Sequence, residues 1–523
     1  MSAEESTTVP PGGPGGEEHR LARGTLAMQA ARVVSIVALL GVATVIGRTY
    51  SLAEFGVYGL TLSFASYVLF VQGSVQAAAV REIAHATTQE ERDRAFTTTV
   101  AAYVVLGGLA GLLIAGVGNA VLGVFDIPAA LESEARLGLV GLALVTLVGW
   151  PLTIFQNVFH GTQRFGLAAV VEIGGYVTFA AVMSVLVLAV GAPLWVVVAA
   201  GGSIPVCSGL AGAVQFLRLR EPFRLRPATA SVAYTRHFGG FSLSVLLTAV
   251  TDIVIYSLDR AILAAFRGAS AVGLYEAAVR PQQLIRVLQG TLVVTVLPAS
   301  SRYVAEDDRA RIRELLLRGT RYVVAATVPI IVTFIVFSAD ILELWLGERY
   351  TGAATAMAIF VASWILGANT GVAGSMLWAA GRMRQRLIYA WVVAALNLVL
   401  SLLFTPLWGL EGVVLGTTVA YTLALPLFLY YVVEAFPITV GDLARSAWLP
   451  GYSLAGGLAA VLVGIQAVGP LDSPAWVVAV CIAAPLAYWA TYYRLFLSQP
   501  ERAFFRQLLS FRGHGGGSRG VPG

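Results

Sequence analysis

The fold is decided by residues 391–433, which read WVVAALNLVLSLLFTPLWGLEGVVLGTTVAYTLALPLFLYYVV and carry a single charge, Glu411. With its flanks, this stretch predicts two helices, at 386–406 and 411–433, each close to the roughly 20 residues that cross a bilayer. Of all 523 residues, 57% are hydrophobic and 12% are charged, whereas soluble domains carry roughly 25% charge. The sequence therefore predicts an all-α polytopic membrane protein.

The rest of the chain continues this pattern, and its hydropathy predicts about fourteen membrane spans. They lie near 26–47, 55–80, 97–121, 137–159, 167–190, 194–217, 239–264, 272–298, 321–344, 352–379, 386–406, 411–433, 447–467 and 474–493. With both termini inside, the inside segments hold 26 of the 34 arginines, and the outside loops hold four. Basic loops favour the cytoplasmic side. We therefore expect a multi-pass protein of the cytoplasmic membrane with both termini in the cytoplasm.

Two short phrases recur 217 positions apart. Phe55-Gly56-Val57-Tyr58 returns as Val272-Gly273-Leu274-Tyr275, and the loop at 90–94 returns at 307–311 with the same offset. A fixed offset of this kind indicates an internal duplication. Each copy holds six predicted spans, so we expect two six-helix lobes related by an axis along the membrane normal. Duplicated lobes with a substrate site between them are typical of membrane transporters.

The duplication also predicts how the chain is divided. We expect a disordered cytoplasmic tail at 1–24, an N-lobe at 25–222 with spans 1–6, a C-lobe at 223–434 with spans 7–12, two extra C-terminal spans at 435–495, and a cytoplasmic segment at 496–523. Within the last segment, 500–512 has the pattern of a short basic amphipathic helix that lies on the inner leaflet, followed by a disordered end.

Charged and polar side chains inside the spans are the candidate functional residues, since a charge at the bilayer centre costs roughly 2.5–3.5 kcal/mol. They gather on spans 1, 7 and 8. The candidates for binding an anionic ligand are Arg32, Arg260, Arg280, Arg286, Gln29 and Gln283, and those for ion coupling or charge pairing are Asp252, Asp259 and Glu276. Arginines outnumber carboxylates here, and the planar guanidinium suits phosphate oxygens.

Simpler interpretations compete with these assignments. Arg32 lies near the cytoplasmic end of span 1 and can snorkel to the headgroups. Asp259 and Arg260 lie near the outer end of span 7 and fit an ordinary interfacial pair. Glu276 and Arg280 are four residues apart and can pair with each other. Asp252 and Arg286 also fit a structural pair between helices.

The sequence shows no enzyme signature. It has no lysine, which excludes a P-loop, and its five histidines are too scattered for a metal site. Cys207 and Cys481 both lie in apolar spans and suggest neither a disulfide nor a metal framework. We expect no enzymatic activity, no nucleic-acid partner and no cofactor beyond a coupling ion, H⁺ or Na⁺.

Several short pieces, in their order and spacing, resemble one known family. They are 48–58 (RTYSLAEFGVY), 259–263 (DRAIL), 272–275 (VGLY), 278–280 (AVR), 297–299 (LPA), 347–350 (GERY) with 353–354 (AA), and 406–412 (PLWGLEG). The resemblance covers about 24–435 and is to the Wzx-type O-antigen and polysaccharide flippases, in the polysaccharide transporter branch of the MATE-like MOP exporter superfamily. The family pattern itself matches only Arg280 and the neighbourhood of Asp259 and Arg260.

The resemblance implies a flippase that moves a polyprenyl-pyrophosphate-linked oligosaccharide from the cytoplasmic to the outer leaflet. It implies alternating access driven by an ion gradient, with central arginines holding the pyrophosphate or acidic sugars. The other partners would be membrane lipids, a polysaccharide polymerase and glycosyltransferases, and the protein would be a monomer. Three alternatives remain: a multidrug or cation antiporter of the same fold, a lipid II flippase, and a membrane assembly factor that transports nothing. Span 2 carries no charge between Phe55 and Val80, which weighs against the lipid II branch.

Overall fold

The computed structural model describes residues 14–229, 250–251, 253–255, 257–294, 296–468 and 473–510. By packing, the chain divides into two units. Unit 1 comprises Met1–Arg280, Trp345–Ala356 and Ala390–Ala420, and unit 2 comprises Pro281–Leu344, Met357–Tyr389 and Tyr421–Gly523. Unit 1 thus joins the predicted N-lobe with three segments of the predicted C-lobe, so the lobe boundaries stay a prediction.

All regular structure in the described part of the chain is helical. Unit 1 contains α1 (Pro14–Thr49), α2 (Leu52–His85), α3 (Gln89–Val121), α4 (Ala129–Leu152), α5 (Ile154–Gly161), α6 (Phe165–Ser184), α7 (Leu194–Gly201) and α8 (Ile204–Leu219). Unit 2 contains α11 (Val296–Ala305), α12 (Arg309–Val336), α16 (Val440–Leu443), the π-helical turn η5 (Ala444–Trp448), α17 (Leu449–Val468), α18 (Pro474–Leu495) and α19 (Gln499–Ser510). Four helices have residues in both units: α10 (Leu258–Val294), α13 (Ser338–Leu346), α14 (Ala354–Ala379) and α15 (Met383–Ala435).

The first helix starts earlier than the sequence predicts. α1 begins at Pro14, so residues 14–24 are helical, although they were expected to belong to a disordered tail. Proline is well suited to the first position of a helix because its missing N–H would have no partner there.

Short polar motifs set where the next helices begin. Ser51 precedes α2; its hydroxyl accepts from the Glu54 backbone N–H at 3.2 Å, and its own N–H donates to the Glu54 carboxylate at 2.8 Å. Thr88 and Glu91 make the same reciprocal cap at the start of α3. Such capping boxes satisfy backbone groups that a helix end leaves without partners. The motifs therefore separate consecutive spans with connections of only a few residues.

Eleven helices in the described ranges are long and apolar enough to cross a membrane, or twelve if α7 and α8, which meet at 53°, form one bent span. Two of these spans contain a non-helical glycine with positive φ, Gly268 in α10 (φ 78°) and Gly409 in α15 (φ 62°). Both lie at turns that the hydropathy places between consecutive spans. A multi-pass helical membrane protein is confirmed, and the count of fourteen spans stays a prediction.

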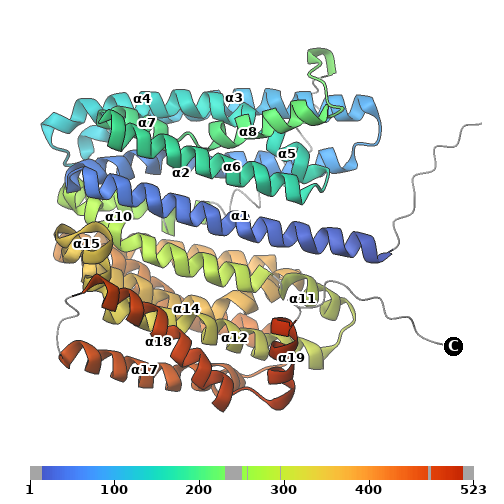
Figure 1. Cartoon of the computed structure of the whole chain (residues 1–523), viewed down its shortest axis with the longest axis vertical. Helices are drawn as coiled ribbons and strands as arrows, with labels where there is room; N and C mark the ends of the chain where they lie inside the picture. The colour runs from blue at the N-terminus through green and yellow to red at the C-terminus, as the bar shows by residue number, and fades with distance from the viewer. Residues whose placement is uncertain are drawn as a thin grey trace, which may run out of the picture. The chain divides into compact units, whose positions relative to one another are not determined.

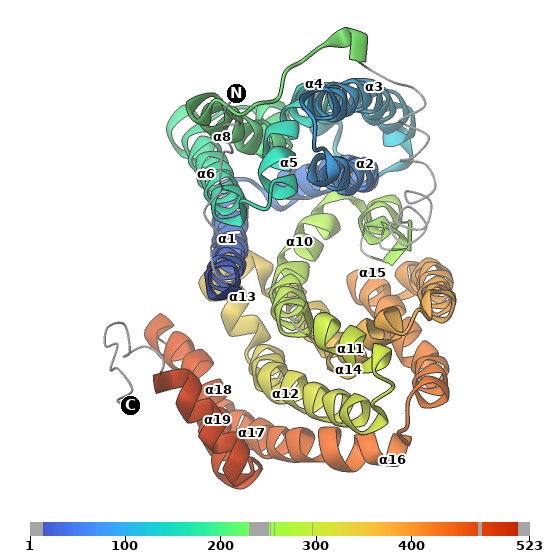
Figure 2. The same cartoon turned by 90° about the vertical axis from the view of Figure 1, so that its right-hand side faces the viewer.

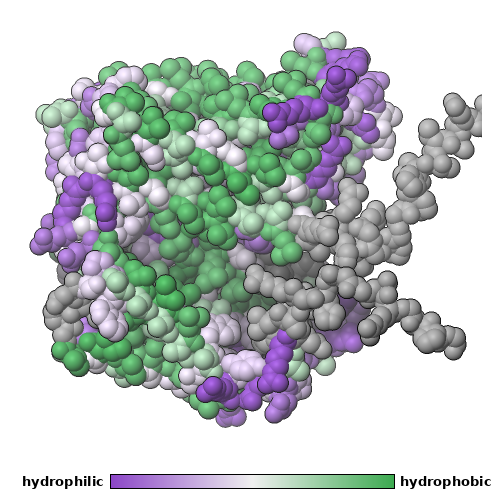
Figure 3. All heavy atoms as spheres, viewed as in Figure 1, coloured by the Kyte–Doolittle hydropathy of each residue, from purple (hydrophilic) through white to green (hydrophobic). Residues whose placement is uncertain are grey.

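Unit 1 is a layered set of helices. α1 packs on α6, α3 on α4, and α4 on both α7 and α8, as Figure 1 shows. Its interior contains large buried side chains such as Trp150, Tyr103 and Phe159. The outward faces of α4, α6 and α8 are mainly hydrophobic, whereas hydrophilic residues gather beyond the end of α8 (Figure 3). Exposed hydrophobic side chains on these helices, such as Leu144, Val177 and Leu217, suit contact with lipid.

Unit 2 is organised around α12, which packs against α17, α18 and η5 (Figure 2). Close approach at this junction depends on Gly451 of α17, where an added Cβ would lie 2.6 Å from a Val324 methyl carbon. The Tyr488 hydroxyl of α18 donates to the Gly451 carbonyl at 2.9 Å. α19, the helix expected at 500–512, follows α18 and contacts α12 through Glu501.

The two copies of the repeated phrase pack on each other within unit 1. A Cβ at Gly56 of α2 would overlap the Ala269 carbonyl oxygen of α10, and a Cβ at Gly273 of α10 would overlap the Leu52 carbonyl oxygen of α2. Gly56 and Gly273 are 217 residues apart, as are Leu52 and Ala269. The contacts are therefore reciprocal, which is the arrangement expected when two copies of one motif face each other across a local two-fold axis. Small residues permit such close helix crossings in membranes.

Candidate functional site

Three of the predicted site residues form one ion-paired cluster in unit 1. The Arg280 guanidinium lies 2.6 Å from Glu276 Oε2, and Arg260 pairs with Glu276 Oε1. Glu276 is 1% exposed, whereas the side chains of Arg260 and Arg280 are 12% and 17% exposed. The pairing of Glu276 with Arg280 is thus confirmed. A buried carboxylate held by two guanidiniums leaves the cluster with a net positive charge.

The turn at Gly268 brings these residues together. Gly268 breaks α10, and the flanking chain is anchored on Asp126, whose N–H donates to the Ala264 carbonyl at 3.2 Å and whose carbonyl accepts from Ala269 N–H at 3.0 Å. The two halves of α10 therefore fold back on each other. Arg260 and Glu276 lie eight residues before and after Gly268, and so they meet side by side.

Asp259 occupies a second polar cluster next to the first. Its Oδ2 accepts from the Tyr275 hydroxyl at 3.2 Å and from the Thr417 hydroxyl at 3.3 Å, and Asn397 Nδ2 donates to Thr417 Oγ1 at 2.7 Å. Asp259 is fully buried, which argues against an ordinary interfacial pair with Arg260. Asn397 makes the hydrogen bond between helices that polar groups in spans commonly make.

Two acceptor oxygens in this cluster lack a partner among the described residues, Asp259 Oδ1 and Asn397 Oδ1. Buried acceptors normally find donors, or else they face a water or a cation. A carboxylate oxygen, an amide oxygen and a hydroxyl are ligands that hard cations accept. No group of three or more His, Cys, Asp or Glu side chains in the ranges that the structure describes is placed to hold a metal ion. The oxygens around Asp259 are therefore one arrangement in unit 1 with the ligand chemistry for a proton or a monovalent cation.

A cavity of about 360 Å³ lies beside the ion-paired cluster, entirely within unit 1. Helices α1, α2, α4, α6, α7, α8 and α10 contribute to its wall, which is mainly hydrophobic. Its polar lining comprises Tyr58, Ser66, Gln72, Thr146, Trp150, Tyr176 and Arg280. Of the described residues that line it, Arg280 alone carries a charge. The cavity thus combines a single guanidinium with apolar and aromatic walls.

Arg280, which lines this cavity, retains a spare donor. Its Nη2 donates to Glu276, whereas its buried Nε has no hydrogen-bond partner among the described residues. A guanidinium offers five N–H donors in a rigid fork, so one carboxylate does not exhaust it. The Glu276 pair therefore holds Arg280 in place and leaves it able to receive an anion.

The structure does not bring every candidate to the cavity. Arg32 is exposed on α1, where Glu172 of α6 is within electrostatic range, and Gln29 has a buried Oε1 with no partner in the described part of the chain. Gln283 is partly buried and Arg286 exposed, and both belong to unit 2. Asp252 lies outside the described residues. The binding roles of the first four and the ion-coupling role of Asp252 stay predictions.

Several residues of the site were not expected from the sequence. Gln72, Tyr176 and Trp150 line the cavity, and Thr417 joins the Asp259 cluster. Gln72 is detectable in principle from the sequence, because it is a polar residue inside span 2. Thr417 resembles many other hydroxyl residues in spans that bond to their own backbone, so it gave no distinguishing signal.

The fold is similar to known transporters. An inward-facing MATE family transporter of the MOP superfamily matches with a TM-score of 0.67 and 14% identity, covering 78% of this chain and 97% of its own. The lipid II flippase MurJ, in an inward closed conformation, also gives 0.67, with 13% identity over 93% of this chain and 100% of its own. At these identities the likeness concerns the fold alone, and it confirms the predicted MATE-like architecture.

Sequence comparison is more specific. The probable flippase AglR of Haloferax volcanii is 27% identical over 257 residues, which are 48% of this chain and 52% of the relative. The match thus spans about half the length of that relative. The family described as "Polysaccharide biosynthesis protein" matches residues 45–355, a range that includes both copies of the repeated phrase, Arg260, Glu276 and Arg280. This protein belongs to that family of polysaccharide biosynthesis proteins.

Proposed function

We propose that this protein is a flippase that moves a polyprenyl-pyrophosphate-linked oligosaccharide from the cytoplasmic to the outer leaflet by alternating access. The observation that carries the proposal is the cavity of about 360 Å³, where an arginine is the one charged residue among the described residues of the lining. An anionic headgroup attached to a long hydrocarbon matches a guanidinium set in apolar walls. The family membership and the flippase named among the relatives support the same class of activity.

Arg280 is the residue that would hold the pyrophosphate. Its planar fork can make two parallel hydrogen bonds to phosphate oxygens. Glu276 would act as a positioning residue, because it holds the guanidinium at the cavity wall and keeps the two arginines from repelling each other. Arg260, held on the other carboxylate oxygen and stacked over the Tyr275 ring at 5.5 Å, would add positive field without reaching the cavity.

The Asp259 cluster would couple transport to an ion gradient. Loading a proton or Na⁺ on Asp259 would neutralise the negative charge beside Arg260 and so change the field at the neighbouring Glu276 and Arg280. The unpartnered oxygens of Asp259 and Asn397 support this assignment. Glu276 is a less favourable carrier because both its oxygens are already held by arginines. Asp252 remains a further candidate from the sequence alone.

The arginine distribution supports a place in the cytoplasmic membrane with both termini inside. A multidrug or cation antiporter would need a negative cavity, and a positive residue at the wall disfavours it. The polymerase and glycosyltransferases that make the glycan are the expected functional partners.

The proposal is tested by a transport measurement in proteoliposomes that contain a fluorescent polyprenyl-pyrophosphate oligosaccharide. Arg280→Ala is expected to reduce flipping at least about tenfold, because it removes a bidentate charge-assisted contact of about 1.5–3 kcal/mol. Arg280→Lys is expected to recover only part of the rate, since an ammonium cannot make the planar fork. Arg136→Ala is the control, because Arg136 makes an exposed pair with Glu132 on α4.

Each outcome decides between functions. If Arg280→Ala flips the substrate as fast as the wild type, the cavity of about 360 Å³ is not the substrate site. Flipping of lipid II in place of the oligosaccharide carrier would indicate the lipid II branch. Export of a cationic dye that survives Arg280→Ala would indicate the antiporter. A folded protein that moves none of these would be an assembly factor.

A further inference from the structure

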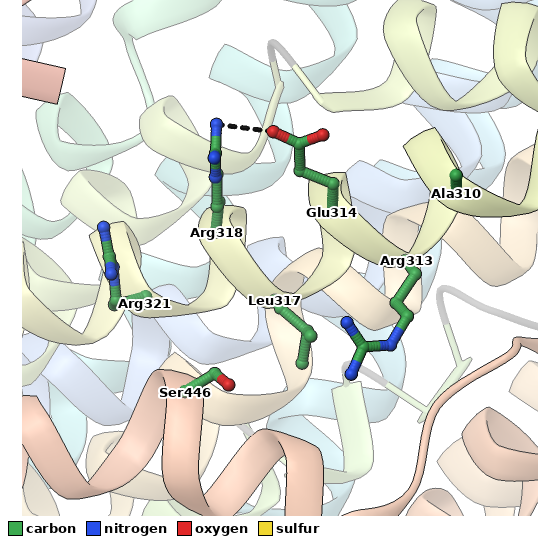
Figure 4. A pocket seen from close by; sticks show the side chains of 7 residues that line it. All are labelled: Ala310, Arg313, Glu314, Leu317, Arg318, Arg321 and Ser446. Atoms are coloured by element: carbon green, nitrogen blue, oxygen red, sulfur yellow. Dashed lines mark ion pairs between the residues drawn. The ribbon is translucent and has the colours of Figure 1, made fainter. Parts of the chain in front are cut away.

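A second cavity, of about 410 Å³, lies in unit 2 between α12 and η5 (Figure 4). Three arginines of α12 line it, Arg313, Arg318 and Arg321, together with Glu314 and with Ser446 of η5. On a helix with 3.6 residues per turn these three arginines fall within about 140° of one side. Figure 4 shows Ser446 facing α12 and Arg318 turned toward Glu314. The proposed flippase function uses none of these residues.

The lining of the cavity holds three arginines and one glutamate, although each arginine has a carboxylate partner. Arg318 pairs with Glu314 at 2.5 Å, Arg313 with Asp442 at 2.8 Å, and Arg321 with Glu501. Of these carboxylates, only Glu314 lines the cavity. The Arg318–Glu314 pair is about half exposed on both sides. Pairs so exposed to water contribute little and rearrange readily, so Arg318 is available to another anion.

A spare donor points to a ligand at the same place. Arg321 Nε is buried and has no hydrogen-bond partner in the described ranges, even though the same guanidinium is paired with Glu501. Buried donors normally have a partner in the protein or in ordered water, so an exception such as this one is compatible with a bound ligand or water. An oxygen anion in the cavity would satisfy Arg321 and could be shared with Arg313 or Arg318.

The cavity lies where the chain passes from charged to apolar sequence. Residues 309–321 of α12 carry five arginines and one glutamate, whereas 322–336 carry no charge. Trp448 lies two residues beyond Ser446 on η5, and tryptophan favours the level of the lipid headgroups. By the arginine distribution, this end of α12 is cytoplasmic. The cavity is therefore expected at the headgroup level of the inner leaflet.

We propose that this cavity binds the phosphate of an anionic phospholipid of the inner leaflet, with Arg313, Arg318 and Arg321 as the recognising groups. Basic pockets beside membrane spans on the cytoplasmic side hold anionic headgroups in this way. Guanidiniums suit phosphate diesters because their forks match two oxygens at once. Glu314 competes with the lipid phosphate for Arg318 and so lowers the affinity of the cavity for the lipid.

The test measures lipid retained by the full-length protein in native mass spectrometry, after equilibration with equal amounts of phosphatidylglycerol and phosphatidylcholine. The wild type is expected to retain phosphatidylglycerol preferentially. Arg313→Gln and Arg318→Gln should each weaken retention about fivefold. Glu314→Gln should strengthen it, because the competing carboxylate is gone. Arg321→Gln is avoided, since the Arg321–Glu501 pair is much less exposed than the pairs of Arg313 and Arg318, and its loss would disturb packing.

Matched controls separate a site from general surface charge. Arg94 and Glu90 form an exposed pair of the same spacing on α3 in unit 1, at 2.7 Å. Arg94→Gln and Glu90→Gln should leave lipid retention unchanged. Equal effects of both sets of variants, or no preference for phosphatidylglycerol, would overturn the proposal. So would displacement of the lipid by millimolar inorganic phosphate, which would assign the cavity to a free anion.

Discussion

Gly59 of α2 lies against the side chain of Glu276 of α10. A Cβ at Gly59 would come within 2.6 Å of both Glu276 Cγ and Oε1. The two residues are 217 positions apart, which is the offset of the predicted repeat, so they are predicted to be equivalent in its two copies. Glu276 can be buried here because Gly59 has no side chain at the place where the two helices cross. The close packing of α2 on α10 thus leaves the space for the ion-paired cluster.

Gly59→Ala is expected to disturb this cluster. The added methyl group must push Glu276 away from its two arginines, and overpacking of this kind costs about 1–3 kcal/mol. We expect a lower thermal unfolding temperature together with slower flipping. Gly73→Ala on the same helix is the control, because nothing lies within 4 Å of its added methyl group. There the change should be neutral or stabilising by about 0.5–1 kcal/mol. Equal behaviour of the two variants would contradict the role given to Gly59.

Glu276 and Arg280 are expected to act as one unit. Glu276→Gln leaves two buried arginines without their counter-ion, and breaking a buried pair in this way costs about 3–5 kcal/mol. The flipping rates of Glu276→Gln, Arg280→Ala and the double variant form a double-mutant cycle. We expect the double variant to be hardly slower than Arg280→Ala alone, because Glu276 works through Arg280. Additive losses would show that Glu276 has an independent role.

Asp259→Asn is expected to separate ion coupling from substrate movement. The amide oxygen can still accept from Tyr275 and Thr417, so the local hydrogen bonds survive while the titratable charge is lost. Flipping driven by a proton or Na⁺ gradient should disappear, whereas gradient-independent exchange between leaflets should continue. Comparing liposomes with Na⁺ and with choline, at fixed and at stepped pH, identifies the ion. Unchanged gradient dependence would move the coupling site away from Asp259.

The contact of α19 with α12 is expected to depend on pH. Burial acts to raise the pKa of Glu501, but hydrogen bonds from Ser498 N–H, Tyr322 and the Ser498 hydroxyl, together with Arg321, lower that pKa below its usual value. A lowered pKa in the folded state gives stabilisation that is complete above the unfolded value of about 4.3 and is lost as pH falls through the folded value. Hydrogen exchange across Gln499–Ser510 should therefore accelerate below about pH 4.

Glu501→Gln tests the same contact at neutral pH. It removes the charge that Arg321 binds, so exchange in α19 should already be fast at pH 7 and should change little on acidification. Arg502 provides the control. Its guanidinium donates to the Leu497 and Arg494 carbonyls and forms no ion pair with Glu501 among the described residues. In Arg502→Gln, hydrogen exchange in α19 should therefore still accelerate when the pH is lowered. Retention of a slow-exchanging α19 in Glu501→Gln would show that apolar packing alone holds the helix.

The sequence by itself determined the membrane class, and it predicts fourteen spans and an internal repeat. These are properties of consecutive residues: apolar runs such as 391–433 have the length of a bilayer, and arginine is distributed unevenly between loops. It also placed Arg260, Glu276 and Arg280 among the candidates, because charges inside spans are costly wherever they lie. The pairing of Glu276 with Arg280 followed from helical spacing within one span.

Only the tertiary structure decided which candidates meet. The turn at Gly268 brings Arg260 onto Glu276, and Thr417 reaches Asp259 from a position 158 residues later in the chain. Arg280 lines the cavity, whereas Arg32 is exposed on α1 and is not among the residues that line it. Helical periodicity predicts which residues share a face, but it does not say which other helix covers that face. The cluster exists because Gly59 leaves room for Glu276, and such complementarity between distant positions arises only when the helices pack.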